Sequence, residues 1–226
     1  MKIYLATGNL NKKRELSEIL KDHQIVIPKD EGIHFDPEET GTDFYENSLI
    51  KAKALYQIVK QPVIADDSGI CVSALNGNPG IYSARYAGPL FPQGKPDKSK
   101  ITQEEQNRFL IQELNDELKN HPEKASLYTK ENGFFNGPRS AHYTCAMVLY
   151  LGNGRVYVVQ ETMEGTLIEN IEEARGNGGF GYDPIFYLPD LGKTAAELSS
   201  DEKNAISHRG KAMRALLKMT DDVLKL

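Results

Sequence analysis

Two consecutive aspartates, Asp66 and Asp67, follow the short apolar stretch 62–65, which predicts a buried strand. In open α/β sheets ligands bind at the carboxyl ends of strands, so we expect these carboxylates at a binding edge. Paired acids in such a place suit Mg²⁺, which takes few carboxylates and leaves other positions to substrate phosphates. Successive strand residues point to opposite faces, so one acid can face the site while the other supports it. The alternative is a structural turn in which an aspartate caps the Asp-Asp-Ser-Gly sequence.

A second candidate site is the turn that joins the predicted strand 2–6 to a helical pattern carrying Leu16, Ile19 and Leu20 on one face. Free N–H groups and the dipole at a helix N-terminus favour an anion, and a lysine in the turn adds a formal charge. The turn has one glycine and is neither a P-loop nor a dinucleotide motif, so an ordinary structural turn is the alternative. Its residues are Thr7, Gly8, Asn9, Leu10, Asn11 and Lys12.

A third candidate is the glycine-rich stretch 178–184, which combines backbone freedom with two aromatic residues and an acid. This set suits a flat ring held by stacking and edge hydrogen bonds, although a glycine-rich hairpin has the same composition. Lys203, His208 and Arg209 come near the start of the last predicted helix and accompany this stretch. The other histidines form no metal motif; they are His23, His34, His121 and His142.

The elements that must position these residues alternate between strands and helices, which predicts an α/β fold. Apolar spacing predicts helices over 42–60 and 102–119 and a last helix from about residue 203. Short strands are expected at 24–27 and 185–187. The segments 140–151 and 155–164, joined by Gly152-Asn153-Gly154, predict a hairpin that belongs to a second sheet. Prolines and glycines mark 88–138 as a peripheral excursion.

Composition limits the classes of function. With 226 residues, 39% hydrophobic and 26% charged, the chain suits one generous domain or two small lobes. A net charge of −5 argues against a protein that coats nucleic acid. The sequence has no apolar run of about 18 residues and no signal-peptide pattern, so we expect a cytoplasmic protein without a membrane span. Cys71 and Cys145 lie far apart without metal-ligand spacing, which favours buried thiols.

Taken together, five segments resemble the inosine and xanthosine triphosphate pyrophosphatases, also called the Ham1-like family. The fold that this resemblance implies is an elongated mixed β-sheet flanked by helices, forming two lobes with a central nucleotide cleft. Residues 1–226 would be a single such domain, with a peripheral insertion at about 88–138 that is longer than the family pattern. The segments are 6–9 with Lys12; 38–41 with Glu46, Asn47 and Lys51; 65–69 continuing through 79–86; 178–184; and 202–210.

The resemblance implies Mg²⁺-dependent hydrolysis of ITP, dITP and XTP to the monophosphate and pyrophosphate. It assigns residues 7–12 to the triphosphate, Glu38 and Asp67 to Mg²⁺, and Asp67 to the role of proton acceptor. Ser68 would contact the substrate, while Phe180, Gly181, Tyr182, Asp183 and Lys203 would enclose the nucleotide. His208 and Arg209 would recognise the purine edge, and the family implies a homodimer.

Physical chemistry agrees with this allocation, because charge on the phosphoryl oxygens needs neutralising and Lys12, Lys51 and Mg²⁺ can supply that. Donors such as Arg209 and protonated His208 would favour the 6-keto edge of hypoxanthine or xanthine over adenine. Two alternatives stay open. One is a related pyrophosphatase for other modified or canonical nucleotides, and the other is a nucleotide sensor that has lost hydrolysis.

Overall fold

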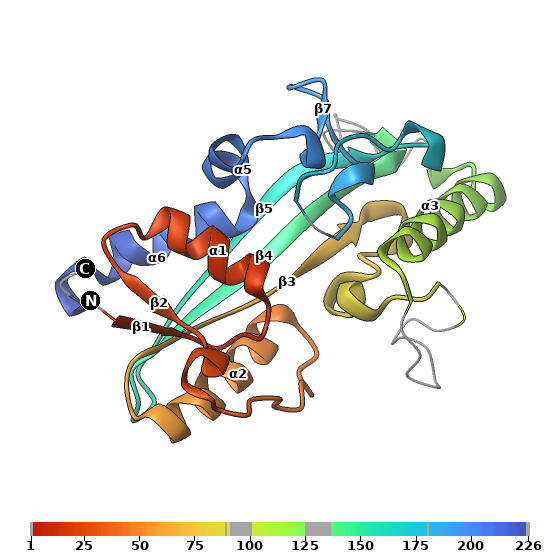
Figure 1. Cartoon of the computed structure of the whole chain (residues 1–226). Coiled ribbons are helices and arrows are strands. Elements are labelled where there is room, and N and C mark those ends of the chain that lie inside the picture. The colour runs from red at the N-terminus through yellow and green to blue at the C-terminus, as the bar shows by residue number, and fades with distance from the viewer. Residues whose placement is uncertain (1, 89, 91–100, 125–136, 180, 225–226) are drawn as a thin grey trace. The chain divides into compact units, whose positions relative to one another are not determined.

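The fold is α/β, with one seven-stranded mixed sheet in the order β2-β1-β3-β4-β5-β6-β7 (Figure 1). The computed structural model describes residues 2–88, 90, 101–124, 137–179 and 181–224. The strands are β1 (Lys2–Leu5), β2 (Gln24–Val26), β3 (Val63–Val72), β4 (Ser140–Tyr150), β5 (Val156–Leu167), β6 (Phe186–Leu188) and β7 (Lys193–Thr194). The helices are α1 (Leu10–Ile19), α2 (Phe44–Val59), α3 (Gln103–Asn120), α5 (Ser200–Ile206) and α6 (His208–Leu224).

The sheet is mixed because β1 pairs in parallel with β2 and β3, whereas β6 pairs antiparallel with β5 and β7. The predicted hairpin is confirmed: β4 and β5 are neighbours, and the Leu151 N–H donates to the Arg155 carbonyl at 3.0 Å across the turn. The expected second sheet is wrong, since β4 lies beside β3 and extends the same sheet.

Strand β3 is longer than the sequence predicts, with ten residues that continue through both aspartates. Asp66 and Asp67 therefore lie inside β3 and not at its carboxyl end, which corrects the expectation. Nevertheless, β1 pairs with β3 only as far as Ile64, opposite Leu5. The two carboxylates thus stand just beyond the carboxyl end of β1, beside the turn that leads into α1.

The last predicted helix is two helices that meet at Ser207. Ser207 is a helix-capping residue type, and its hydroxyl accepts from the Gly210 N–H at 3.1 Å at the start of α6. A side chain at Gly210 would begin 2.0 Å from the Asn204 carbonyl oxygen, so only glycine permits this close approach of α5 and α6. The break sets His208 and Arg209 in the first turn of α6.

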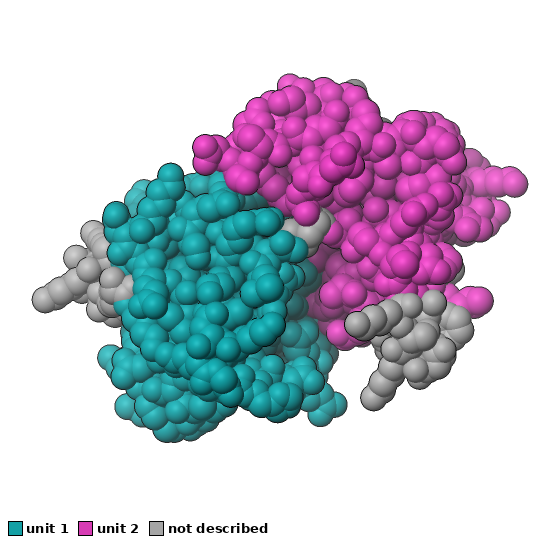
Figure 2. Space-filling model, in the orientation of Figure 1, with its two compact units in different colours: residues 1–68, 144–162, 204–226 teal, residues 69–143, 163–203 magenta. Residues whose placement is uncertain are grey.

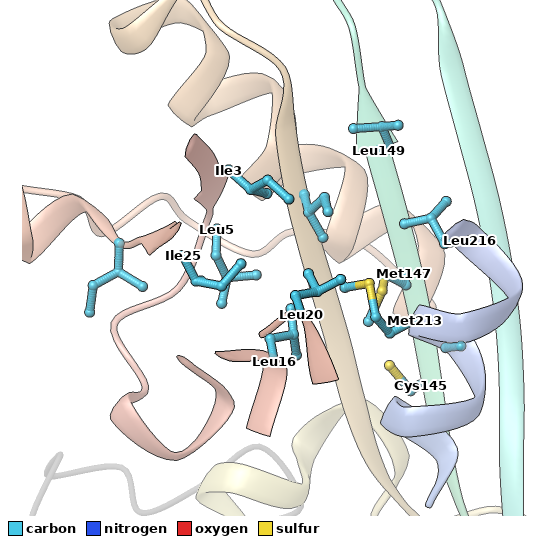
Figure 3. Close-up of a cluster of buried hydrophobic side chains, with 13 residues drawn as sticks. Ile3, Leu5, Leu16, Leu20, Ile25, Cys145, Met147, Leu149, Met213 and Leu216 are labelled. Atoms are coloured by element: carbon cyan, nitrogen blue, oxygen red, sulfur yellow. The ribbon is translucent and has the colours of Figure 1, made fainter. Parts of the chain in front are cut away.

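The chain forms two compact units, coloured separately in Figure 2. Unit 1 comprises 1–68, 144–162 and 204–226, and unit 2 comprises 69–143 and 163–203. In unit 1, helices α1 and α6 cover one face of the sheet, where Leu16, Met147 and Met213 pack together (Figures 1 and 3). Helix α2 covers the other face through Ala52 and Leu55.

In unit 2, helix α3 buries Leu110, Ile111 and Leu114, and the rings of Tyr143 and Phe186 lie 4.7 Å apart. Helix α3 comes from the segment 88–138, whose peripheral place stays a prediction. The described residues include no helix that is long and apolar enough to cross a membrane. Both cysteines are buried and form no disulfide, as expected.

Candidate active site

The turn before α1 presents a capped helix N-terminus. The Asn9 side chain accepts from the N–H groups of Asn11 at 2.8 Å and Lys12 at 3.4 Å, and the Thr7 hydroxyl accepts from the Asn9 N–H at 3.0 Å. Gly8, Asn9 and Leu10 are exposed. The side chain of Asn9 thus holds two of the N–H groups that the sequence offered to an anion, and Lys12 provides the formal charge.

Asp66 is fully buried and lies on the α1 and α6 face of the sheet, where its Oδ2 is 2.9 Å from the Lys12 Nζ and 3.2 Å from the Arg209 Nε. The Cys145 thiol lies 3.9 Å from the same oxygen. Burial acts to raise the pKa of Asp66, but the charges of Lys12, Arg209 and Lys51 outweigh it and lower the pKa. Asp66 is therefore an ionised anchor for two cations at neutral pH.

Arg209 directs its donors at three protein groups. Besides Asp66, its Nη1 pairs with Glu15 of α1, and its Nη2 donates to the Ser68 hydroxyl at 2.8 Å. The side chain is only 2% exposed. Burial acts to lower the pKa of this guanidinium, but Asp66 and Glu15 overcome that effect and raise it. Arg209 therefore links α1, β3 and α6, and positions Ser68 beside the aspartates.

Asp67 points to the opposite face of the sheet, toward α2. Its Oδ1 is 3.0 Å from the Lys51 Nζ, and the Asn47 amide lies 3.4 Å from its Oδ2. Burial raises the pKa of Asp67, the charges of Lys51 and Lys12 lower it, and Glu39 raises it again, so the net shift is upward. Asn47 and Lys51 are one turn apart on α2, so the helix presents both to the same carboxylate.

Glu39, and not Glu38, contacts the lysine that pairs with Asp67. The Glu39 Oε1 is 2.9 Å from the Lys51 Nζ, so Glu39 and Asp67 share one ammonium, whereas Glu38 is exposed. Two carboxylates on one lysine leave unbalanced negative charge next to Asp67. The raised pKa of Lys51 agrees with this: burial acts to lower it, but the carboxylates of Asp67, Glu39 and Asp66 more than compensate.

The ion-paired side chains around Asp66 and Asp67 form one cluster that carries more negative than positive charge. In the described part of unit 1, its ion pairs join four carboxylates to three cationic groups. The arrangement therefore suits a cation held by carboxylates better than a bare phosphate. Among the described residues, no three or more His, Cys, Asp or Glu side chains are grouped so that they could hold a metal ion by themselves. The carboxylates are Glu15, Glu39, Asp66 and Asp67, and the cations are Lys12, Lys51 and Arg209.

Unit 2 contains the glycine-rich candidate. Here the Lys203 Nζ pairs with the Asp183 Oδ2 at 2.6 Å, and both residues are buried. Gly179 has φ of +72°, and a side chain there would begin 2.1 Å from the same Asp183 oxygen, so the loop requires glycine at this place. The resemblance assigns Asp183 and Lys203 to the nucleotide, and this role stays a prediction, while Phe180 lies outside the described residues.

Tyr182 is buried, and its hydroxyl donates to the Ser83 carbonyl at 2.9 Å. Its ring is thus part of the packing of unit 2 and offers little free face for stacking. His208 is also buried, in unit 1. Sequence reasoning gave no role to Glu15 or to Asp66 as a double ion-pair partner. The one available signal for Glu15 is its spacing of three from Lys12 on α1.

Known proteins are similar to this chain over nearly its whole length. A model described as the Ham1 family matches residues 3–219. A dITP/XTP pyrophosphatase from Treponema denticola is 52% identical over 213 residues, covering 94% of this chain and 95% of that protein. One from Leptospira interrogans is 42% identical, covering 95% and 94%. The solved structure of the Staphylococcus aureus Ham1 protein matches with a TM-score of 0.73 at 34% identity, covering 98% of this chain and 99% of that one. On this evidence, the chain belongs to the Ham1 family.

Proposed function

We propose that this protein hydrolyses non-canonical purine nucleoside triphosphates, namely ITP, dITP and XTP, to the monophosphate and pyrophosphate. The observation that carries the proposal is the buried Asp67 carboxylate, held by Lys51 close to the Lys12 end of α1. Asp67 provides a base and a cation-binding oxygen, and Lys12 and Lys51 provide two ammonium groups for phosphate. Relatives named dITP/XTP pyrophosphatase support the substrate class.

We assign the cofactor as Mg²⁺, and Asp67 as its first protein ligand. The second ligand was expected to be Glu38, but the contact of Glu39 with Lys51 supports Glu39 in its place. The excess of carboxylates in the cluster fits a divalent cation. When bound, Mg²⁺ would neutralise charge on the phosphate oxygens and lower the pKa of a bound water.

Lys12 and Lys51 bind the phosphates in this account. Both ammonium groups now contact carboxylates, so an arriving phosphate exchanges one anionic partner for another and no new desolvation of the lysines is needed. Asp67 and Glu39, freed from Lys51, are then available to the cation. The lysines are already in place for the negative charge that develops on the phosphate oxygens.

Asp67 accepts the proton of the attacking water or orients that water toward the phosphorus. Its burial favours the neutral form and makes the carboxylate a stronger base than an exposed aspartate. Asn47 limits the rotation of the carboxylate through its contact with Oδ2. Asp66 does not take this part, because its Oδ2 holds Lys12 and Arg209 on the opposite face of the sheet.

Base recognition is assigned to the loop 178–184 with Lys203 and to His208 and Arg209. The three contacts of Arg209 within the protein support a further role, in which it fixes Ser68 and Asp66. The homodimer, the cytoplasmic location and the central nucleotide cleft stay predictions.

Relative turnover of different nucleotides tests the substrate class. With Mg²⁺ present, we expect kcat/KM for ITP, dITP and XTP to exceed that for ATP, GTP and modified pyrimidine triphosphates by at least about a hundredfold. Equal rates on all of them would contradict the selective proposal, and binding without turnover would favour a nucleotide sensor.

A further inference from the structure

In unit 2, helix α3 holds the segment 86–88 at two points one helical turn apart. The Tyr86 hydroxyl donates to the Glu113 carboxylate, and Gly88 lies against the ring of Phe109. Tyr86 is 1% exposed. Because Phe109 and Glu113 are four residues apart, they lie on the same face of α3. This face of the helix therefore fixes the chain immediately after the 3₁₀ turn Gly80–Arg85.

The same 3₁₀ turn holds the glycine-rich loop. The Ser83 carbonyl accepts the Tyr182 hydroxyl at 2.9 Å, while the Ser83 hydroxyl accepts from the Ile70 N–H at 2.9 Å and donates to the Gly80 carbonyl at 2.6 Å. Ser83 is thus tied to β3 on one side and to Tyr182 on the other. Glu113 thus holds Tyr86, and Ser83, three residues earlier in the chain, holds Tyr182.

The charge of Glu113 also acts on Tyr182. Burial raises the pKa of the Tyr182 hydroxyl, and the charge of Glu113 raises it further. Helix α3 is itself anchored beside this point, because the Lys124 Nζ pairs with Glu117 and donates to the Ala74 carbonyl at 2.6 Å. Glu113 therefore accepts from the buried Tyr86 hydroxyl on a helix that is also anchored through Glu117 and Lys124.

We propose that Glu113 is a positioning residue for the base-binding loop: by holding Tyr86 it fixes the chain next to Ser83, whose carbonyl holds Tyr182. This inference rests on the proposed function, which assigns that loop to the base. It gives helix α3, from the segment 88–138, a role in substrate binding. Because the contacts run to the base-binding loop and not to Asp67 or Lys51, their loss should weaken nucleotide binding more than chemistry.

The test compares Glu113→Ala with Glu113→Gln, whose amide oxygen still accepts the Tyr86 hydroxyl. For Glu113→Ala we expect KM for ITP to rise about tenfold with kcat within about twofold, as for loss of one charge-assisted hydrogen bond. Glu113→Gln should restore KM to within about threefold of the wild type. Asp116→Ala is the matched control, because it removes an exposed acid from the same helix and should leave both constants unchanged. Equal losses in Glu113→Ala and Glu113→Gln, or a fall in kcat alone, would overturn the proposal.

Hydrogen exchange without nucleotide separates this proposal from the proposed function. In Glu113→Ala, peptides covering Tyr182 and Asp183 should exchange at least about fivefold faster, while peptides covering Asp67 keep the wild-type rate. Tyr86→Phe should reproduce the change, and combining the two variants should add little to either. Unchanged exchange around Tyr182 would refute the positioning role even if ITP is hydrolysed. Faster exchange in a protein that fails to turn over ITP would uphold it and contradict only the substrate.

Discussion

The two adjacent aspartates should respond in opposite ways to loss of their charge. Asp66→Asn removes the shared partner of Lys12 and Arg209, whereas Asp67→Asn leaves Lys51 still paired with Glu39. Both substitutions preserve side-chain shape. We therefore expect Asp66→Asn to lower stability, and Asp67→Asn to abolish activity without lowering stability.

The magnitude for Asp66 follows from its burial. Removing one partner of a buried ion pair costs about 3–5 kcal/mol, and here the lost charge faces two cations. For a chain of this size each kcal/mol shifts Tm by about 2–4 °C, so Asp66→Asn should lower Tm by roughly 6–20 °C. The folded state lowers the pKa of Asp66, so this stabilisation is present above the unfolded-state pKa and is lost as pH falls. The difference in Tm between the wild type and Asp66→Asn should therefore become smaller at acid pH.

The pKa shift of Asp67 has the opposite sign, because its pKa is raised in the folded state. Folding disfavours its ionised form, so above the folded-state pKa the charge contributes no stability that the asparagine would lose. The expected result in Mg²⁺-free buffer is an unchanged or higher Tm. Turnover of ITP should fall by at least about a hundredfold, because the water loses its proton acceptor.

Thermal unfolding at pH 7.5 and at acid pH, with ITP turnover on the same samples, checks both aspartates. A Tm for Asp66→Asn equal to the wild type would refute the buried network. A large drop in Tm for Asp67→Asn would show that its carboxylate is structural. Near-normal turnover of Asp67→Asn would remove Asp67 from its assigned role.

Three further predictions concern other parts of the chain. Glu39→Gln should raise the Mg²⁺ concentration for half-maximal activity by at least about tenfold, whereas Glu38→Gln should leave it nearly unchanged. If a Mg²⁺ titration shows the larger increase for Glu38→Gln, Glu38 is the ligand. Burial, together with the charge of a nearby glutamate, raises the pKa of Glu113 from 4.5 to about 7, so the stability of the wild type relative to Glu113→Gln should decline as pH rises between these values, and parallel urea titrations at pH 5 and 8 would show an equal difference if Glu113 titrated normally. Gly210→Ala should lower Tm by several degrees, because its side chain would begin 2.0 Å from the Asn204 carbonyl oxygen; an unaltered melting curve would mean that α5 and α6 can separate at no cost.

Local patterns in the sequence predicted most elements of the fold. The spacing of Leu49, Ala52 and Leu55 gave helix α2, and Gly152-Asn153-Gly154 gave the turn between β4 and β5. The pattern failed at β3, because two consecutive acids are typical of a turn. In the folded chain those acids are buried, and their charges are compensated by ion pairs with residues distant in sequence. No local pattern reveals such pairs.

The same limit applies to the site. The helix-start pattern indicated Lys12, and the resemblance indicated Lys51 and Asp67, and in unit 1 each lysine contacts one of the two aspartates. Glu15 and the pairing of Arg209 with Asp66 were not predicted, because their contacts join α1, β3 and α6. Exposed and half-buried acids look alike in sequence, so the contact of Glu39 with Lys51 could not be predicted from it.

The products formed from ITP and Mg²⁺ test the central claim most directly. Phosphorus NMR of the reaction should show IMP and pyrophosphate appearing together, with neither product formed by Asp67→Asn. IDP with orthophosphate would place cleavage at the wrong bond and contradict the account.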